Sequence, residues 1–187
     1  MHTADARDDV DAETLRVENI FGAVGLALVD KMQRAFSEAS GLNPSAVAAI
    51  VQVGTSPDLS IEQLRRIVAL SHSATVRLVD QLAGDGLVTR VAGDGDKRAR
   101  ALRLTEAGEA LYRRCLASRR AVLKRAVAGL DTDDMRGLGT LVEKLLPALV
   151  DPGDDQDVVC RVCDEKVCVP ERCPATHLQP AAAEGPR

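Results

Sequence analysis

The chain has 187 residues, 45% of them hydrophobic and 2% aromatic, with a formal net charge of −4. This length suffices to bury a core and indicates one domain, or one domain with an appendage. So few aromatic side chains argue against modules that stack single-stranded bases. No run of about 20 apolar residues could span a bilayer, and the acidic first 14 residues are unlike a secretory or transit peptide. We therefore expect a cytoplasmic protein with no membrane partner.

The negative total conceals an uneven distribution of charge. The net charge is −5 over residues 1–60, +7 over residues 61–125 and −6 over residues 126–187. A local positive field can steer a protein toward phosphates even when its total charge is negative. The plain alternative is a charged face that only contacts water.

The N-terminal third predicts a flexible arm followed by two helices. Residues 1–13 are acidic and should form the arm. From about Thr14 to Ala39, apolar residues recur every three or four positions, which indicates a long helix that packs in the core or against a second subunit. Asn43 and Pro44 begin a second, buried helix, and we expect a loop over residues 54–59.

The stretch over residues 59–108 predicts a helix, a turn, a second helix and a hairpin. Ser60 and Gln63 form a capping-box pattern at the start of the first helix. The second helix is expected from about Ser73 to Ala83. The hairpin strands are expected over residues 87–91 and 101–104, with a basic connecting tip. This order is typical of a winged helix-turn-helix, which places one helix in the DNA major groove.

Two more long helices are predicted after the hairpin. The first begins at Thr105 and reaches about Gly129, with one apolar side and one side rich in arginine. The second is capped by Asp131 or Thr132 and carries an apolar stripe as far as Leu149. Residues 151–187 form a cysteine-rich tail that we expect to be disordered at its end.

The middle of the chain resembles the MarR family of transcriptional regulators. The resemblance rests on an ordered series of residues: Leu70-Ser71, Thr75-Val76, Leu78-Val79-Asp80-Gln81-Leu82, Gly86-Leu87-Val88, Arg90, Asp96-Lys97-Arg98, Leu102, Leu104-Thr105 and Gly108. It implies a mainly α fold with a small β-hairpin wing, in which a MarR-type domain covers residues 14–150. The winged helix-turn-helix would occupy about 44–104, and the dimerisation helices about 14–39 and 105–149.

The family resemblance also implies what the protein does. It implies a homodimer that binds a pseudo-palindromic operator in double-stranded DNA, usually as a repressor. It implies a small-molecule effector as well, although this sequence has few aromatic residues to line a pocket. No enzymatic role is expected.

Candidate DNA contacts lie on the second short helix and on the wing. At the start of the helix, arginine can bond guanine through two contacts, whereas one of Ser71 and Ser73 should be the N-cap. For the wing, the resemblance implies that Arg98 enters the minor groove and that Asp96 pairs with a nearby arginine. The expected contact residues are His72, Ser73, Thr75, Arg77, Gln81, Asp96, Lys97, Arg98 and Arg100.

Four cysteines stand within fourteen residues of the tail: Cys160, Cys163, Cys168 and Cys173. A C-x-x-C turn aims two sulfurs at one point, and two further thiolates can complete a site for zinc or for an iron–sulfur cluster. A thiol switch is the third interpretation, because neighbouring cysteines can form a disulfide on oxidation. Cys115 lies on an apolar stripe and is expected in the core.

Two alternatives to a DNA-binding regulator remain open at the level of sequence. One is a thiol–disulfide redox protein that uses Cys160 and Cys163, but the sequence lacks the βαβ pattern beside the C-x-x-C of thioredoxin-like enzymes. The other is an adaptor whose winged unit binds protein. A comparison of affinities for specific and random duplexes separates the adaptor from the regulator.

Overall fold

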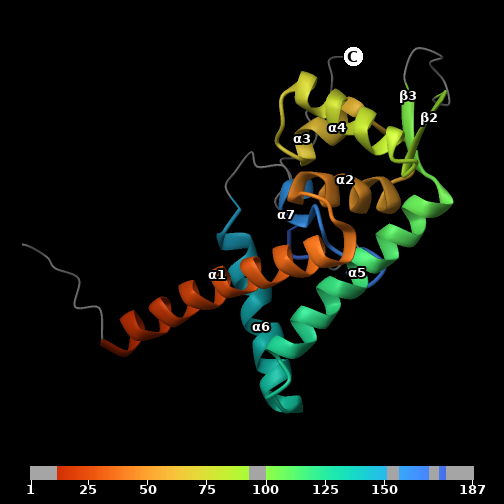
Figure 1. Ribbon diagram of the computed structural model, residues 1–187. Helices are drawn as coiled ribbons and strands as arrows, with labels where there is room; N and C mark the ends of the chain where they lie inside the picture. Colours follow the sequence, from red (N-terminus) through yellow and green to blue (C-terminus); the bar gives the residue numbers. More distant parts are fainter. Residues whose placement is uncertain (1–11, 93–99, 151–155, 169–172, 176–187) are drawn as a thin grey trace, which may run out of the picture.

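The computed structural model describes residues 12–92, 100–150, 156–168 and 173–175, which fold into a mainly helical structure with one small sheet (Figure 1). Its elements in chain order are α1 (Ala12–Ser40), α2 (Pro44–Thr55), β1 (Leu59–Ser60), α3 (Ile61–Ile67), α4 (His72–Gly84), β2 (Val88–Ala92), β3 (Arg100–Leu104), α5 (Glu106–Ala126), α6 (Thr132–Ala148) and α7 (Gln156–Cys160). The mainly α fold with a hairpin wing is confirmed. A short helix in the tail, α7, was not predicted.

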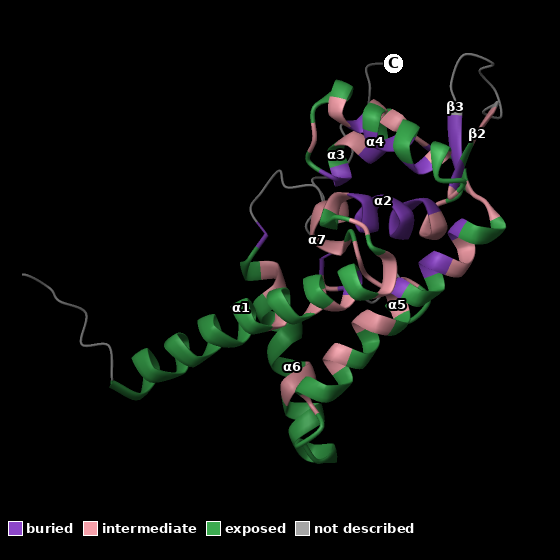
Figure 2. Ribbon diagram, viewed as in Figure 1, coloured by how far each residue is buried: buried purple, intermediate pink, exposed green. Residues whose placement is uncertain are grey.

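Helix α2 forms the centre of the core. Its residues 46–53 are all buried, and most are Ala or Val, so neighbouring helices can approach closely. The helix begins where the Asn43 side chain accepts a hydrogen bond from the Ala46 N–H at 2.9 Å, with Pro44 at the first position. Figure 2 shows this helix buried along most of its length, between the helix-turn-helix and α5.

The three strands form an antiparallel sheet in the order β1-β3-β2. Leu102 lies at its centre, opposite both Leu59 and Arg90, and is fully buried. The predicted loop over residues 54–59 ends in β1, which has two residues and is therefore too short to show an alternating pattern. The wing hairpin is thus joined to the segment that precedes α3.

Helix α5 begins directly beneath the hairpin. The Thr105 hydroxyl accepts the Gly108 N–H at 3.0 Å and donates to the Gly86 carbonyl at 2.6 Å, so one side chain caps the helix and holds the turn before β2. A Cβ atom on Gly108 would stand 2.0 Å from the Leu87 carbonyl oxygen. Only glycine fits where this helix meets the hairpin.

Helices α1 and α6 carry apolar surface that the subunit itself does not cover. The predicted stripe of α1 is buried only at Phe36, while Ile20, Phe21 and Val24 stay exposed. Helix α6 has no buried residue, although it has a complete capping box at Asp131. Figure 2 shows both helices largely exposed as they extend from the core. None of the described helices is long and apolar enough to cross a membrane.

The contact at Gly108 gives a test of the fold. Gly108→Ala should lower the free energy of unfolding by about 3 kcal/mol, the upper part of the range for overpacking, because a backbone oxygen cannot rotate away. Urea unfolding followed by circular dichroism, at one fixed protein concentration, measures the change.

Gly84→Ala is the matched control. Gly84 ends α4, and a Cβ atom there meets nothing within 4 Å, so this change should leave stability within about 1 kcal/mol of the parent. Equal losses for the two variants would show that α5 does not meet the hairpin as described.

Candidate nucleic-acid interface

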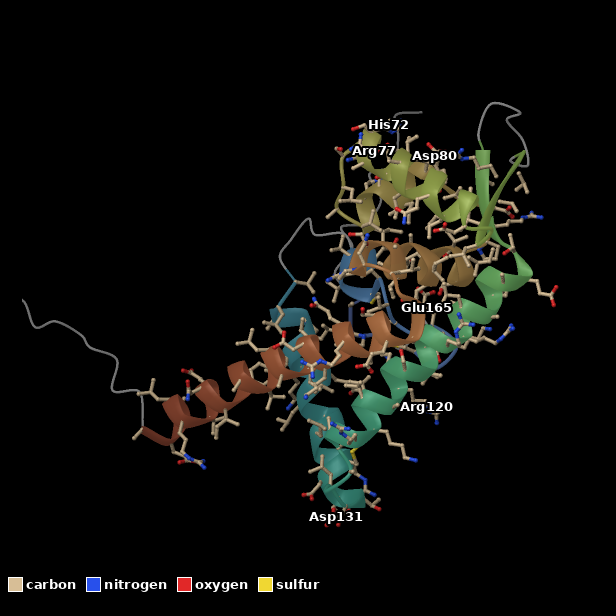
Figure 3. The ribbon with its side chains drawn as sticks, viewed as in Figure 1. His72, Arg77, Asp80, Arg120, Asp131 and Glu165 are labelled. Atoms are coloured by element: carbon tan, nitrogen blue, oxygen red, sulfur yellow. The ribbon has the colours of Figure 1, made fainter. Side chains whose placement is uncertain are left out.

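The start of α4 presents polar side chains on an open surface. Ser71 is the N-cap, and its hydroxyl accepts the Ala74 N–H at 3.3 Å. Ser73 is therefore free of the capping role, and His72, expected in the turn, is instead the first helical residue. Figure 3 shows His72 and Arg77 at the end of the molecule opposite α6. The exposed members of the predicted contact set on this helix are His72, Ser73, Arg77 and Gln81.

Thr75 is a correction to the predicted set. We expected it on the exposed face, but its side chain is fully buried and its hydroxyl donates to the Ser71 carbonyl at 3.0 Å. It lies on the same side of α4 as Leu78, Val79 and Leu82, which pack into the core. Helical periodicity explains the position, because residues three, four and seven apart share one face. Thr75 is a structural residue of the helix.

A tight turn fixes α4 against α3. Ala69 takes a positive φ of 52°, and its N–H donates to the Arg66 carbonyl at 3.2 Å. The Leu70 N–H donates to the Arg65 carbonyl at 3.3 Å, so two carbonyls at the end of α3 are satisfied. Alanine rarely adopts this left-handed conformation, and the residue type gave no sign of it.

Charged side chains surround the start of α4. Glu62 on α3 accepts hydrogen bonds from the Arg65 guanidinium at 2.8 to 3.0 Å, and these lower the pKa of its carboxyl group. A carboxylate oxygen of Glu62 also lies 3.9 Å from His72 Nδ1. The negative charge of Glu62 is therefore compensated locally, which leaves Arg77 as an exposed cation on the outer face.

Two ion pairs hold the base of the wing. Arg90 on β2 bonds the Asp80 carboxylate of α4 at 2.6 Å, which ties the hairpin to that helix. On the other side, Arg103 on β3 forms a two-pronged pair with Asp58 at 2.7 and 2.9 Å, and this pair lowers the pKa of Asp58. Neither pair was predicted. An acid and a base 45 residues apart in sequence carry no local signal that they meet.

The predicted wing contacts cannot be placed. Asp96, Lys97 and Arg98 lie outside the described residues, and so does the side chain of Arg100, whose backbone begins β3. Their roles at DNA stay predictions. The described strands nevertheless direct the hairpin to the side of the molecule that carries α4 (Figure 1).

The structure brings the four tail cysteines together. The Cys160 thiol forms side-chain hydrogen bonds with Cys163 and Cys173, and Cys168 forms one with Cys173. The bond from Cys160 lowers the pKa of Cys163 to about 6 and raises the pKa of Cys160. Within the described ranges, no three or more His, Cys, Asp or Glu side chains are already placed to hold a metal ion. Cys115 is fully buried, as expected, and burial raises its pKa.

Comparisons with known proteins agree with this architecture. The model of the MarR family matches residues 40–99, from the end of α1 to the wing. The YusO protein of Bacillus subtilis has a similar structure, with a TM-score of 0.64 and 21% identity over 74% of this chain and 99% of that one. This likeness concerns the fold.

Two structures of a MarR-family protein of Mycobacterium tuberculosis are also similar. The complex with DNA has a TM-score of 0.55 and 26% identity, over 68% of this chain and 95% of that chain. The complex with salicylic acid has a TM-score of 0.53 and 28% identity, over 74% and 98%. The matched segment carries α4 and the wing, and relatives from that family share the fold around it. Residues 40–99 thus match the MarR family of transcriptional regulators, and the fold of the chain is similar to that of proteins from this family.

Proposed function

We propose that the protein acts as a homodimer that binds a pseudo-palindromic operator in double-stranded DNA and represses transcription. The observation that carries the proposal is the outer face of α4, where His72, Ser73, Arg77 and Gln81 stand exposed at one end of the molecule. Side chains near the start of a recognition helix reach base edges in the major groove. The relative that forms a complex with DNA supports this assignment.

The dimer follows from the surface of α1 and α6. One winged unit covers little DNA, so useful affinity normally needs two copies on adjacent half-sites. Both helices expose apolar side chains to solvent, a cost that a second subunit would remove. Apart from Leu26, which lies on the opposite face of α1, the exposed large apolar residues on and beside these helices are Leu15, Val17, Ile20, Phe21, Val24, Val29, Leu130, Met135, Leu141, Val142, Leu145 and Leu149.

A small-molecule effector is part of the proposal. A groove of about 950 Å³ lies between α1 and α5, lined by aliphatic residues such as Leu28 and Val122. Its charged lining residues are the cations Lys31, Arg34 and Arg125 and one acid, Glu38. This combination suits an anion with an apolar body, and the Mycobacterium tuberculosis relative forms a complex with salicylic acid. We infer that an effector in this groove would change the spacing of the two α4 helices in a dimer.

Arg77 provides the first test of DNA reading. Arg77→Ala should weaken binding to the operator by about 1–3 kcal/mol and relax the preference at one base pair, because a base contact is lost. By contrast, Arg98→Ala should weaken binding to specific and random duplexes alike. Mobility-shift titrations with both duplexes, at one stated salt concentration, measure these effects.

Arg120→Ala is the matched control for charge. Arg120 is exposed on α5, away from α4, and its loss removes the same positive charge (Figure 3). Operator affinity should stay within about twofold of the parent, as expected for a distant charge screened by salt. If Arg77→Ala binds both duplexes as Arg120→Ala does, α4 does not read the operator. That result would favour an adaptor whose winged unit binds protein.

The apolar stripe of α1 gives a test of the dimer. The double variant Phe21→Asp and Val24→Asp places two charges on side chains that are 48% and 47% exposed in the subunit, so the subunit itself should still fold. Sedimentation at micromolar concentration should show a dimer for the parent and a monomer for the variant, because buried unpaired charges oppose association.

Leu26→Asp on the same helix is the control. Leu26 is 72% exposed and lies nine residues from Val17, which places it on the opposite face of α1. This variant should remain a dimer. A monomeric parent would remove the homodimer from the proposal.

A further inference from the structure

The cysteine segment is docked on the folded body of the protein. The Gln52 side chain of α2 is 3% exposed and donates to the Cys160 carbonyl at 3.5 Å. Val162 packs against the core, and the Lys166 ammonium lies 5.8 Å from the centre of the Tyr112 ring of α5. Figure 1 shows α7 beside α2. A buried amide on α2 thus has its partner in a segment more than one hundred residues later.

The docked segment brings four thiols close enough to interact with one another. Cys160 interacts with Cys163 and Cys173, and Cys168 interacts with Cys173 and Cys163, and these interactions shift the pKa of the thiols. Cys173 is itself buried, with Ala175 fully buried beside it in sequence. Two turns shape the segment, since the Cys163 N–H donates to the Cys160 carbonyl at 2.7 Å and the Cys168 N–H donates to the Asp164 carbonyl at 3.0 Å.

Two arginines and one acid, Glu165, act on this cluster. Arg119 of α5 interacts electrostatically with Cys163 and Cys168, and Arg161 does so with Cys163. The Nε atom of Arg119 is buried and has no hydrogen-bond partner among the residues described. A buried donor that lacks an acceptor commonly marks an absent ion or ligand atom. The same side chain interacts electrostatically with Cys163 and Cys168, whose sulfurs become strong acceptors when they are thiolates.

We propose that Cys160, Cys163, Cys168 and Cys173 form a four-thiolate site for one divalent metal ion of the zinc class. On binding, the four thiols lose four protons and form four metal–sulfur bonds, so that the site carries a charge of −2. Arg119 and Arg161 compensate this charge, and Arg119 Nε donates to a thiolate. Such donors orient and stabilise metal ligands.

The metal-free arrangement is consistent with this site. The Cys163 N–H donates to the Cys160 carbonyl at 2.7 Å, a turn that aims both thiols at one point, although the described side chains are not yet grouped around a metal position. Bonds of about 2.3 Å to one tetrahedral ion set sulfurs about 3.8 Å apart. The thiols, which interact with one another in the docked segment, would take up those positions when the ion replaces their protons.

The two other interpretations of the cysteines account for less. An iron–sulfur cluster places iron and inorganic sulfide between the thiolates and would hold them farther apart than one shared ion does. A disulfide between Cys160 and Cys163 would be neutral, so the buried Arg119 Nε would still lack a charged acceptor. It would also leave Cys168 and Cys173 without a role.

The test begins with the full-length protein purified under reducing conditions. Mass spectrometry should find close to one zinc-class ion per chain. Cobalt(II) added to the metal-free protein should give the visible bands of a tetrahedral site and a near-ultraviolet sulfur-to-metal band. Acid-labile sulfide with iron, a Cys160–Cys163 disulfide, or four free thiols without metal would each overturn the proposal. Metal content is measured without DNA, so its failure is separate from failure of the proposed function.

Variants define the ligands. Cys168→Ser, at an exposed position, should lower the sulfur-to-cobalt band and weaken metal binding, and an unchanged band would exclude Cys168 from the site. Arg119→Gln should weaken metal binding by about 10–100-fold, the usual effect of losing a ligand-supporting donor. The neighbouring, exposed Arg120→Gln is the matched control and should bind as the parent does. Equal metal affinities for the two arginine variants would contradict the role proposed for Arg119.

Discussion

Close packing around α2 is the constraint on which the rest of the structure depends. Eight consecutive buried residues leave this helix no solvent face over more than two turns, so every neighbour must approach it closely. Tyr112 does so at Gly54, where an added Cβ atom would lie 2.7 Å from the ring. The helix-turn-helix lies on one side of α2 and α5 on another (Figure 2). The orientation of α4 relative to the long helices is set by this packing.

Much of this arrangement could be predicted from the sequence because its signals are local. The cap at Ser60 and the long apolar stripe of α1 each lie within a few turns of chain, and the structure confirms the helices that they predicted. The sequence predicted an apolar stripe on α1 without deciding whether the core or a second subunit covers it. In the structure, most of this stripe is exposed. Periodicity shows which face of a helix is apolar, but it does not show what covers that face.

The features that sequence analysis missed depend on distant partners or on unusual backbone conformation. Thr75 has a polar side chain that normally lies at the surface, and only its bond to the Ser71 carbonyl allows its burial. The pairs Asp80–Arg90 and Asp58–Arg103 join separate elements. The left-handed Ala69 has no marker in its residue type. Each of these shapes the candidate interface, although none carries a motif.

The contact between Gln52 and the tail has a consequence for the evolution of the protein. A segment that follows the last long helix would ordinarily be free to lengthen, shrink or disappear, because nothing inside the domain depends on it. Here an amide in the central helix relies on that segment for its partner. Deleting the segment would leave a polar group unsatisfied in the interior. Lineages that lose the cysteines should therefore also replace Gln52 with an apolar residue.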